Sequence, residues 1–311
     1  MSKHGKTAKV ALSVAVLLLI INIFWGISNS RNEQKSVSKQ KAYPLLSKRI
    51  LANNPNDIII NFVPLRKKLE AKFGKLTVQK SFYFEYLPDG TSIKIGDDKE
   101  LVAASLIKLP LIMNLYHAAE LKRIDLDKKV TVTEGDIDGG FGDFYKKGVG
   151  TQLTLREAAK ITLEESDNTT AHVIFDAVNG KLKYDEESLA RLDVDQTMEQ
   201  GQAVISAKSY SSVLKSLYFS AYLNNQDSQE VLGYLSNSIF TNRLTKFLPK
   251  SVPVAHKIGV FNTVWSESDC GIVYAVKRPY SICIMVGLPD DEASDFMAEV
   301  SKDVYDFVSE Q

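Results

Sequence analysis

Metal-binding and redox side chains are scarce in this sequence. Its 311 residues include two cysteines and four histidines, and the histidines do not have the spacing of metal ligands. No glycine-rich phosphate-binding loop precedes a predicted helix, and no internal repeat is present. We therefore predict that the protein needs no metal and no cofactor.

The two cysteines, Cys270 and Cys283, fall in strand-like runs on either side of a turn at residues 277–280. Centring a hairpin on that turn places Cys270 opposite Gly287 and Cys283 opposite Tyr274. Two cysteines must be close neighbours to form a disulfide. The sequence therefore predicts two buried free thiols.

Charge of one sign is not in excess either, since Lys and Arg together number 38 and Asp and Glu together number 38. Four of the basic residues lie in the first 31 positions, which hold no acid, so the remainder has 34 basic and 38 acidic residues. This mild acidity argues against a nucleic-acid partner, and against an anionic membrane partner for the folded part. The sequence carries no signal of an oligomeric state.

Residues 10–28 contain no charged side chain and have an aliphatic run, residues 16–21, at their centre. Nineteen helical residues span roughly 28 Å, close to the thickness of the hydrocarbon core. Because lysines precede this segment, residues 1–31 are predicted to form a single-pass cell-membrane anchor with the rest of the chain outside the cytoplasm. The alternative is a cleaved signal peptide, although residues 26–28 match a cleavage site poorly.

Residues 32–57 are polar without a sustained period, which predicts an extracytoplasmic tether before a domain at residues 58–311. Helical periodicity is clear at both ends of this domain, at residues 62–73 and 293–308, and helical patterns dominate residues 103–248. Strand-like runs occupy residues 78–86, 91–95, 254–260, 271–276 and 281–287.

These elements predict an α/β fold of the α+β type. An antiparallel sheet would be covered by the N- and C-terminal helices, and an all-helical lobe would be inserted in its middle. A functional site would then lie in the crevice between the sheet and the lobe.

A polar pair, Ser105 and Lys108, begins one of the apolar helical patterns. Residues three apart share a helix face, and a lysine against an apolar wall loses its proton more readily. Such a lysine can act as the base that makes a serine hydroxyl nucleophilic. The Ser-x-x-Lys spacing recurs elsewhere in the chain, so it is weak evidence alone.

The order of three elements is more specific than any one of them. Ser105 and Lys108 are followed by Ser166-Asp167-Asn168, and then by Lys257-Ile258-Gly259 on a predicted strand. From about residue 60 to residue 311, the chain resembles the class A β-lactamases and their relatives among the penicillin-binding serine hydrolases. This resemblance implies the same architecture as the pattern of elements.

The resemblance also implies roles for the polar residues. Ser105 would be the acylated nucleophile and Lys108 its base. Ser166 would pass a proton to the leaving nitrogen, Asn168 would bind the substrate amide, and Lys257 would supply positive charge near Ser166 and the substrate carboxylate. Acyl transfer to nitrogen needs a nucleophile, a proton acceptor, a proton donor and an oxyanion site.

Further residues complete the predicted substrate site. Gly259 and Val260 lie on the substrate-binding strand, and the backbone N–H groups of Ser105 and Val260 would hold the oxyanion. Arg243 is either a second cation for a substrate carboxylate or a surface arginine. Phe141 or Tyr145 forms either an aromatic gate or a core or loop-packing contact.

Two departures from the family pattern bear on function. Ile258 stands where the family has Thr or Ser, which removes a hydrogen bond to a substrate carboxylate, roughly 0.5 to 1.5 kcal/mol. The loop that carries the deacylating Glu and an Asn four residues later is shorter here. Glu199 is the candidate stand-in, although Ala203 is the fourth residue after it, and Glu186 and Glu187 are less well placed.

Three functions are consistent with the sequence. The first is a serine hydrolase that opens a β-lactam amide through an acyl-enzyme on Ser105. The second is a D-alanyl-D-alanine peptidase or penicillin-binding protein that acts on peptidoglycan peptide. The third is a catalytically silent cell-wall binding module.

Overall fold

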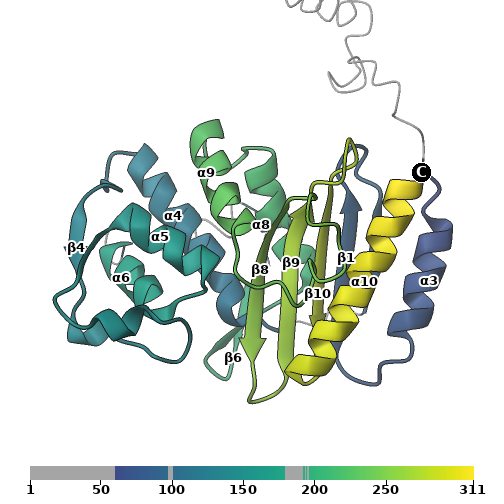
Figure 1. Ribbon diagram of the computed structural model, residues 1–311, viewed down its shortest axis with the longest axis horizontal. Coiled ribbons are helices and arrows are strands. Elements are labelled where there is room, and N and C mark those ends of the chain that lie inside the picture. Colours follow the sequence, from purple (N-terminus) through teal and green to yellow (C-terminus); the bar gives the residue numbers. More distant parts are fainter. Residues whose placement is uncertain (1–59, 97–100, 179–191, 193, 195) are drawn as a thin grey trace, which may run out of the picture. The chain divides into compact units, whose positions relative to one another are not determined.

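The computed structural model describes residues 60–96, 101–178, 192, 194 and 196–311. An antiparallel sheet in the order β2-β1-β10-β9-β8 forms its centre (Figure 1). The N-terminal hairpin and three C-terminal strands make up this sheet. The strands are β1 (Lys80–Tyr86), β2 (Ser92–Ile95), β8 (Val254–Phe261), β9 (Ser266–Val273) and β10 (Tyr280–Val286).

Two helices from opposite ends of the domain lie side by side on one face of the sheet (Figure 1). They are α3 (Val63–Phe73), with a proline in its first turn and Gly74 at its C-terminal end, and α10 (Asp290–Glu310). Their apolar faces pack on the sheet through an aromatic cluster that includes Phe73 and Phe82, whose ring centroids are 5.1 Å apart.

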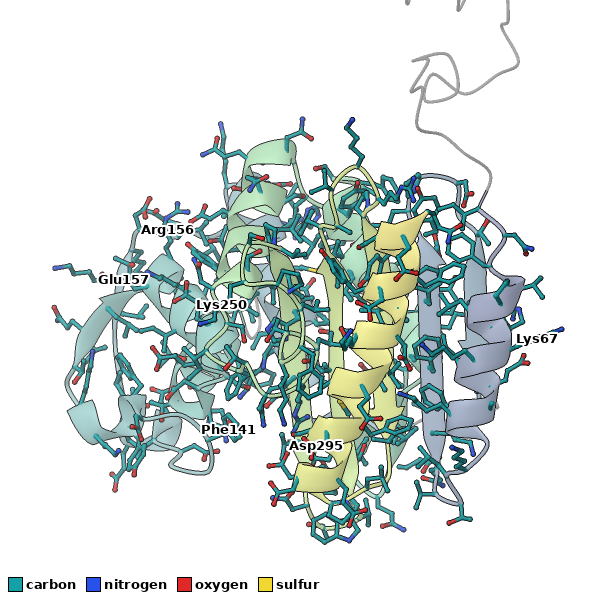
Figure 2. The ribbon with its side chains drawn as sticks, turned by 45° about the vertical axis from the view of Figure 1, so that its right-hand side comes forward. Lys67, Phe141, Arg156, Glu157, Lys250 and Asp295 are labelled. Atoms are coloured by element: carbon teal, nitrogen blue, oxygen red, sulfur yellow. A yellow bond between two sulfur atoms is a disulfide. The ribbon has the colours of Figure 1, made fainter. Side chains whose placement is uncertain are left out.

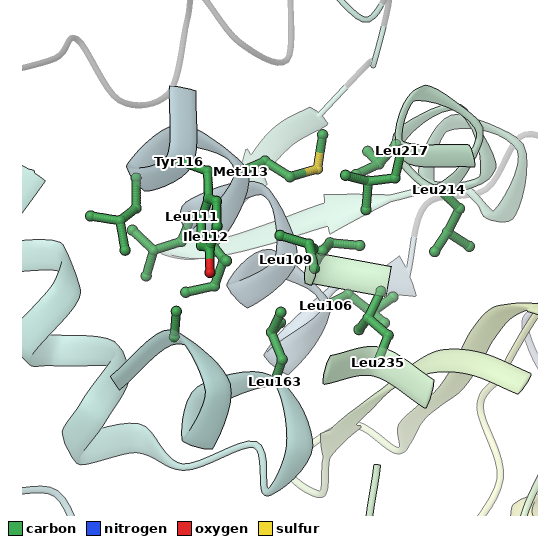
Figure 3. Close-up of a cluster of buried hydrophobic side chains, with 14 of the residues drawn as sticks. Leu106, Leu109, Leu111, Ile112, Met113, Tyr116, Leu163, Leu214, Leu217 and Leu235 are labelled. Atoms are coloured by element: carbon green, nitrogen blue, oxygen red, sulfur yellow. The ribbon is translucent and has the colours of Figure 1, made fainter. Parts of the chain in front are cut away.

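The other face of the sheet carries α8 (Ala207–Tyr218) and α9 (Asn225–Ser236), next to a helical lobe with three helices among the described residues (Figure 1). The lobe contains α4 (Lys108–Glu120), α5 (Leu155–Glu164) and α6 (Asn168–Val178). A buried apolar cluster joins α4 to its neighbours, which fixes the lobe against α8 and α9. Its members include Leu106, Leu109, Leu111, Ile112, Met113, Tyr116, Leu163, Leu214, Leu217 and Leu235 (Figure 3).

Short strands and 3₁₀ turns border the lobe. One small sheet contains β3 (Leu101–Val102), β7 (Gln202–Ile205) and β6 (Gln196–Glu199), and another pairs β4 (Lys129–Thr131) with β5 (Gln152–Thr154). The 3₁₀ turns are η1 (Ala104–Ile107), η2 (Glu134–Asp136) and η3 (Phe144–Lys147).

The predicted fold class is confirmed: a central antiparallel sheet, terminal helices on one face and an inserted helical region. The sequence Thr154-Leu155-Arg156-Glu157 has the pattern of a capping box. The box forms at the start of α5, because Thr154 Oγ1 accepts from Glu157 N at 3.1 Å and Glu157 Oε2 accepts from Thr154 N at 2.7 Å. The inserted region also holds β4 to β7, which lie within residues 103–248, where helices and loops were predicted. These strands are too short for a period of two to be visible.

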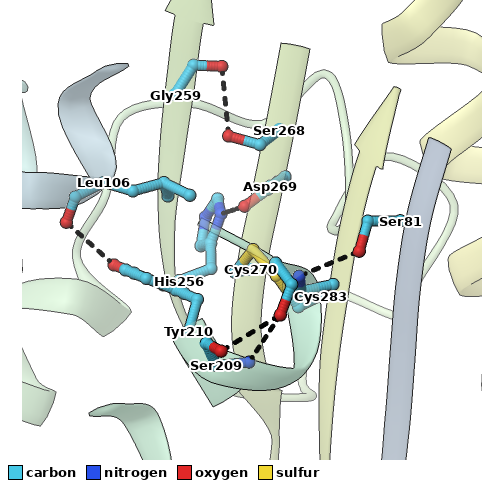
Figure 4. The surroundings of a disulfide bond; sticks show 12 residues. Ser81, Leu106, Ser209, Tyr210, His256, Gly259, Ser268, Asp269, Cys270 and Cys283 are labelled. Atoms are coloured by element: carbon cyan, nitrogen blue, oxygen red, sulfur yellow. Dashed lines mark hydrogen bonds and ion pairs between the residues drawn. A yellow bond between two sulfur atoms is a disulfide. The ribbon is translucent and has the colours of Figure 1, made fainter. Parts of the chain in front are cut away.

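The prediction of two free thiols is wrong, because Cys270 and Cys283 form a disulfide between β9 and β10 (Figure 4). The strand register pairs the two residues directly. The hairpin loop runs from residue 274 to residue 279, so its centre lies two positions before the predicted one. That shift turns two distant cysteines into cross-strand partners.

No helix in the described part of the chain is long and apolar enough to cross a membrane. The predicted anchor, residues 1–31, and the predicted tether, residues 32–57, lie outside the described residues and stay predictions. The bounds of the predicted domain, residues 58–311, also stay predictions.

The disulfide should contribute to stability because it closes a loop of 13 residues and restricts the unfolded chain. We expect the double variant Cys270→Ser/Cys283→Ser to lose about 2–4 kcal/mol of unfolding free energy in urea titrations. The control is the wild-type protein with and without reductant. Two titratable thiols in unreduced, denatured wild-type protein would contradict the disulfide.

Candidate active site

Ser105 lies in a fixed turn between the sheet region and α4. The Ala103 N–H donates to Ala203 O at 2.8 Å, and Tyr210 OH donates to Leu106 O at 3.3 Å. Ala104 has φ of 46°, a left-handed conformation that costs energy for a residue with a Cβ. The fully buried Leu106 anchors the turn from the other side.

A cavity of about 620 Å³ opens beside this turn. It lies between the helical lobe and the edge strand β8, as the predicted crevice does. Its polar and backbone lining brings together residues that are far apart in the sequence, among them Ser105, Lys108, Asn168, His172, Gln202 and Val260.

Lys108 is buried at the start of α4, and its amine binds the Ser-Asp-Asn corner. Its Nζ donates to Ser166 O and, at 2.6 Å, to Asn168 Oδ1. Burial lowers the pKa of Lys108 to about 8, against the opposing effect of the Asp167 and Asp138 charges. Roughly a tenth of such amines are neutral at pH 7, so Lys108 can accept a proton.

The Ser-Asp-Asn corner is held rigidly by its middle residue. The buried Asp167 carboxylate accepts from Phe144 N at 2.9 Å and from Thr170 N at 2.8 Å, which ties the loop to the first turn of α6. A Cβ at Gly142 would lie 2.2 Å from Asp167 Oδ2, so only glycine fits there. Ser166, at φ 57°, is thereby held in a left-handed conformation.

Lys257 reaches the same corner from β8. Its Nζ donates to Ser166 Oγ at 2.7 Å and to Ile258 O at 3.2 Å. Burial and then the nearby Lys108 charge lower the pKa of Lys257 well below its ordinary value. Two buried amines therefore meet at one serine, and a proton on one disfavours a proton on the other.

Strand β8 comes very close to the Ser105 turn because residue 259 has no side chain. A Cβ on Gly259 would lie 2.5 Å from Ser268 Oγ and 2.7 Å from Ala103 O. The close approach brings Val260 to the cavity that Ser105 lines. The predicted oxyanion site of Ser105 N–H and Val260 N–H needs this juxtaposition.

Arg243 is neither a surface arginine nor a free cation facing the substrate cavity. The side chain is 2% exposed, and its Nη2 pairs with Glu267 Oε2 at 2.6 Å and with Asp290 Oδ1 at 2.7 Å. Its Nη1 donates to Ser268 O at 2.9 Å. Because two carboxylates hold its charge away from the cavity lining, we assign Arg243 a structural role that ties β9 to α10.

The shortened loop contributes the β6–β7 hairpin, in which Glu199 pairs with Gln202. Gln202 lines the cavity, whereas Glu199 is exposed and is not among its described lining residues. The deacylation role of Glu199 stays a prediction. The alternatives Glu186 and Glu187 lie outside the described residues.

Aromatic packing closes one side of the site. The Phe141 ring lies 6.0 Å from Lys108 Nζ and 5.7 Å from the Phe240 ring. Figure 2 shows Phe141 near the junction of the helical lobe and the sheet. The ring therefore makes a packing contact and also borders the buried amine.

Two residues beside the cavity, Asp138 and His172, were not predicted from the sequence. Asp138 exchanges hydrogen bonds with Thr169, since Asp138 N donates to Thr169 Oγ1 at 3.0 Å and Thr169 Oγ1 donates to Asp138 O at 3.1 Å. His172 lines the cavity and has its Nε2 3.7 Å from Asp138 Oδ2. The sequence does contain a signal for His172, because it follows Asn168 by four residues and so lies on the same face of α6.

The cavity between a helical lobe and a sheet edge, lined by Ser105 and Lys108 beside the Ser166 corner, is the arrangement expected of a serine acyl-transfer enzyme. The family model described as the β-lactamase enzyme family matches residues 64–308. The chain therefore belongs to the β-lactamase enzyme family, and it is a hydrolase of the serine β-lactamase type.

Individual relatives have low sequence identity to this chain but match it along most of their length. Beta-lactamase BRO-1 of Moraxella catarrhalis is 21% identical over 298 residues, which covers 83% of this chain and 88% of that protein. Beta-lactamase CARB-3 of Pseudomonas aeruginosa is 22% identical over 266 residues, covering 78% and 87%.

Solved structures share the fold. The structure of PBP-A has a TM-score of 0.73 at 21% identity, covering 80% of this chain and 97% of that one. The β-lactamase from Chitinophaga pinensis has a TM-score of 0.72 at 20% identity, covering 78% and 98%.

We expect Gly259→Ala to reduce nitrocefin hydrolysis, because the added methyl group must push β8 away from the Ser105 turn. A loss of about tenfold to a hundredfold in kcat/KM corresponds to roughly 1.4–2.7 kcal/mol of lost transition-state stabilisation. The control is Gly233→Ala in α9, where a Cβ meets nothing within 4 Å. Unchanged kcat/KM in Gly259→Ala would contradict the close approach.

Proposed function

We propose that Ser105 opens the amide of a β-lactam ring and becomes acylated. The observation that carries the proposal is the buried Lys108 amine, whose pKa of about 8 makes it a usable base beside the Ser105 turn. The ordered motifs and the family membership support the same chemistry.

Each step of acylation has a candidate group. Ser105 Oγ gives its proton to the neutral Lys108 amine as it bonds to the carbonyl carbon. The N–H groups of Ser105 and Val260 receive the developing oxyanion. The amide C–N bond then breaks, and the proton passes through the Ser166 hydroxyl, held by Lys257 Nζ at 2.7 Å, to the leaving nitrogen.

Substrate contacts follow from the same arrangement. Asn168 accepts from Lys108 through its side-chain oxygen and donates to Asp138 through its amide nitrogen, whose second hydrogen can bind the substrate acyl-amide oxygen. A protonated Lys257 attracts the substrate carboxylate. Ile258 offers no hydroxyl to that carboxylate, so we propose weaker substrate binding than a Thr or Ser would give.

A peptidase acting on D-alanyl-D-alanine ends of cell-wall peptide is the second candidate. It is supported by the exposed position of Glu199, away from the described cavity lining. The solved structure of a PBP-A mutant, which was determined as an acyl-enzyme complex of PBP-A with penicillin G, has a TM-score of 0.73 to this chain at 21% identity.

Nitrocefin turnover and intact-protein mass spectrometry separate these functions. We expect steady hydrolysis by the wild-type protein and loss of both hydrolysis and the acyl adduct in Ser105→Ala. The matched control is Ser212→Ala, in another Ser-x-x-Lys match on α8. A single persistent adduct without turnover would favour the peptidase, and no adduct with a penicillin or an activated D-Ala ester would favour a silent binding module.

We also propose that residues 1–31 anchor the enzyme at the outer side of the cell membrane. The 19 uncharged residues at 10–28 and the lysines before them support this placement. Full-length protein should sediment with membranes and stay there in high salt, whereas a chain without residues 1–31 should not. Release of the full-length protein in a shortened form would support cleavage instead.

A further inference from the structure

We propose that His172 is the base that activates the water that hydrolyses the acyl-enzyme. The inference rests on the proposed function, because it concerns the fate of the acyl group on Ser105. The supporting observation is the position of His172. It lines the same cavity as Ser105 and Lys108, lies one helical turn after Asn168, and has the Asp138 carboxylate beside it.

The position of His172 along α6 sets it close to the reacting groups. Asn168 Oδ1 lies 2.6 Å from Lys108 Nζ, which fixes the start of α6 at the catalytic end of the cavity. His172 follows four residues later, about 6 Å along the helix axis. The side chain is 50% exposed, so water reaches it.

Other titratable groups of the described cavity lining fit this role less well. Lys108 is the proposed base for acylation, and its Nζ already donates to Ser166 O and Asn168 Oδ1. Asp176 is also in the lining, but it lies eight residues from Asn168, about 12 Å along the axis. Imidazole is the side chain that most readily accepts and returns a proton near neutral pH.

Asp138 lies beside the imidazole. Its Oδ2 lies 3.7 Å from His172 Nε2, and its Oδ1 accepts from Gly140 N at 2.6 Å. The Gly140 N–H, and then Asn168, His172 and Lys108, hold the pKa of Asp138 below its ordinary value. The 3.7 Å separation is longer than a hydrogen bond, so Asp138 acts as a nearby negative charge on the Nε2 side of the ring, and in the proposed step the Nδ1 lone pair accepts the proton.

The hydrolytic step then balances without any other reactant. A water oxygen bonds to the ester carbonyl carbon while one water proton moves to His172 Nδ1. The tetrahedral intermediate collapses, the bond between the carbonyl carbon and Ser105 Oγ breaks, and the proton on His172 passes to Ser105 Oγ. The products are a carboxylic acid and free Ser105.

Penicillin G tests this step through separate measurements of adduct formation and adduct loss. We expect His172→Ala and His172→Gln to acylate within about threefold of the wild-type rate and to deacylate roughly 10²–10⁴-fold more slowly. Quenched samples would show a mass adduct on Ser105 that persists. Added imidazole should shorten the adduct lifetime in His172→Ala and leave it unchanged in His172→Gln.

The control is His117→Ala, which removes a histidine of α4 that pairs with Glu120 outside the described cavity lining. A His172→Ala adduct lost at the wild-type rate would overturn the inference and leave the proposed function standing. The inference is also overturned if the wild-type adduct persists equally, a result that favours the peptidase, or if Asp176→Asn, Glu186→Gln, Glu187→Gln or Glu199→Gln alone stabilises the adduct. No adduct in the wild-type protein would defeat the proposed function itself.

Discussion

Two buried lysine amines meet at Ser166, and the arrangement of the site depends on this contact. Lys108 binds the Ser166 carbonyl and Lys257 binds its hydroxyl at 2.7 Å. Burial disfavours the charged form of both amines, and the charge of Lys108 further lowers the pKa of Lys257. Either amine therefore loses a proton more readily than an exposed lysine, which suits the proposed acyl transfer, because that reaction takes a proton from a serine and gives one to a nitrogen.

The surrounding fold supplies what this contact requires. Asp167 clamps the corner that holds Ser166 at positive φ, and the absence of a side chain at Gly259 lets β8 approach the Ser105 turn. Behind β8, the Arg243 pair with Glu267 ties β9 to its surroundings, and the disulfide joins β9 to β10. The sheet behind the two amines is thus held together by a disulfide and an ion pair.

The features that could be predicted from the sequence are those that depend on interactions between residues close together in the chain. The Thr154 capping box, the terminal helices and the order of the three motifs were readable because each depends on neighbours in sequence. The Cys270 register was not, because it depends on the length of a hairpin loop. Arg243 meets Glu267 and Asp290 only through tertiary packing, and the β6–β7 turn at Gln200-Gly201, both at positive φ, joins strands too short to show a period.

Burial should make Lys108 a usable base, and direct titration of its side chain tests this. Lysines labelled with ¹³C at Cε can be followed by NMR, with the Lys108 signal assigned by its loss in Lys108→Arg. We expect a midpoint near pH 8, so that the neutral fraction, and with it Ser105 acylation, rises as pH increases through that value. A midpoint near the ordinary lysine value of about 10.4 would contradict the account.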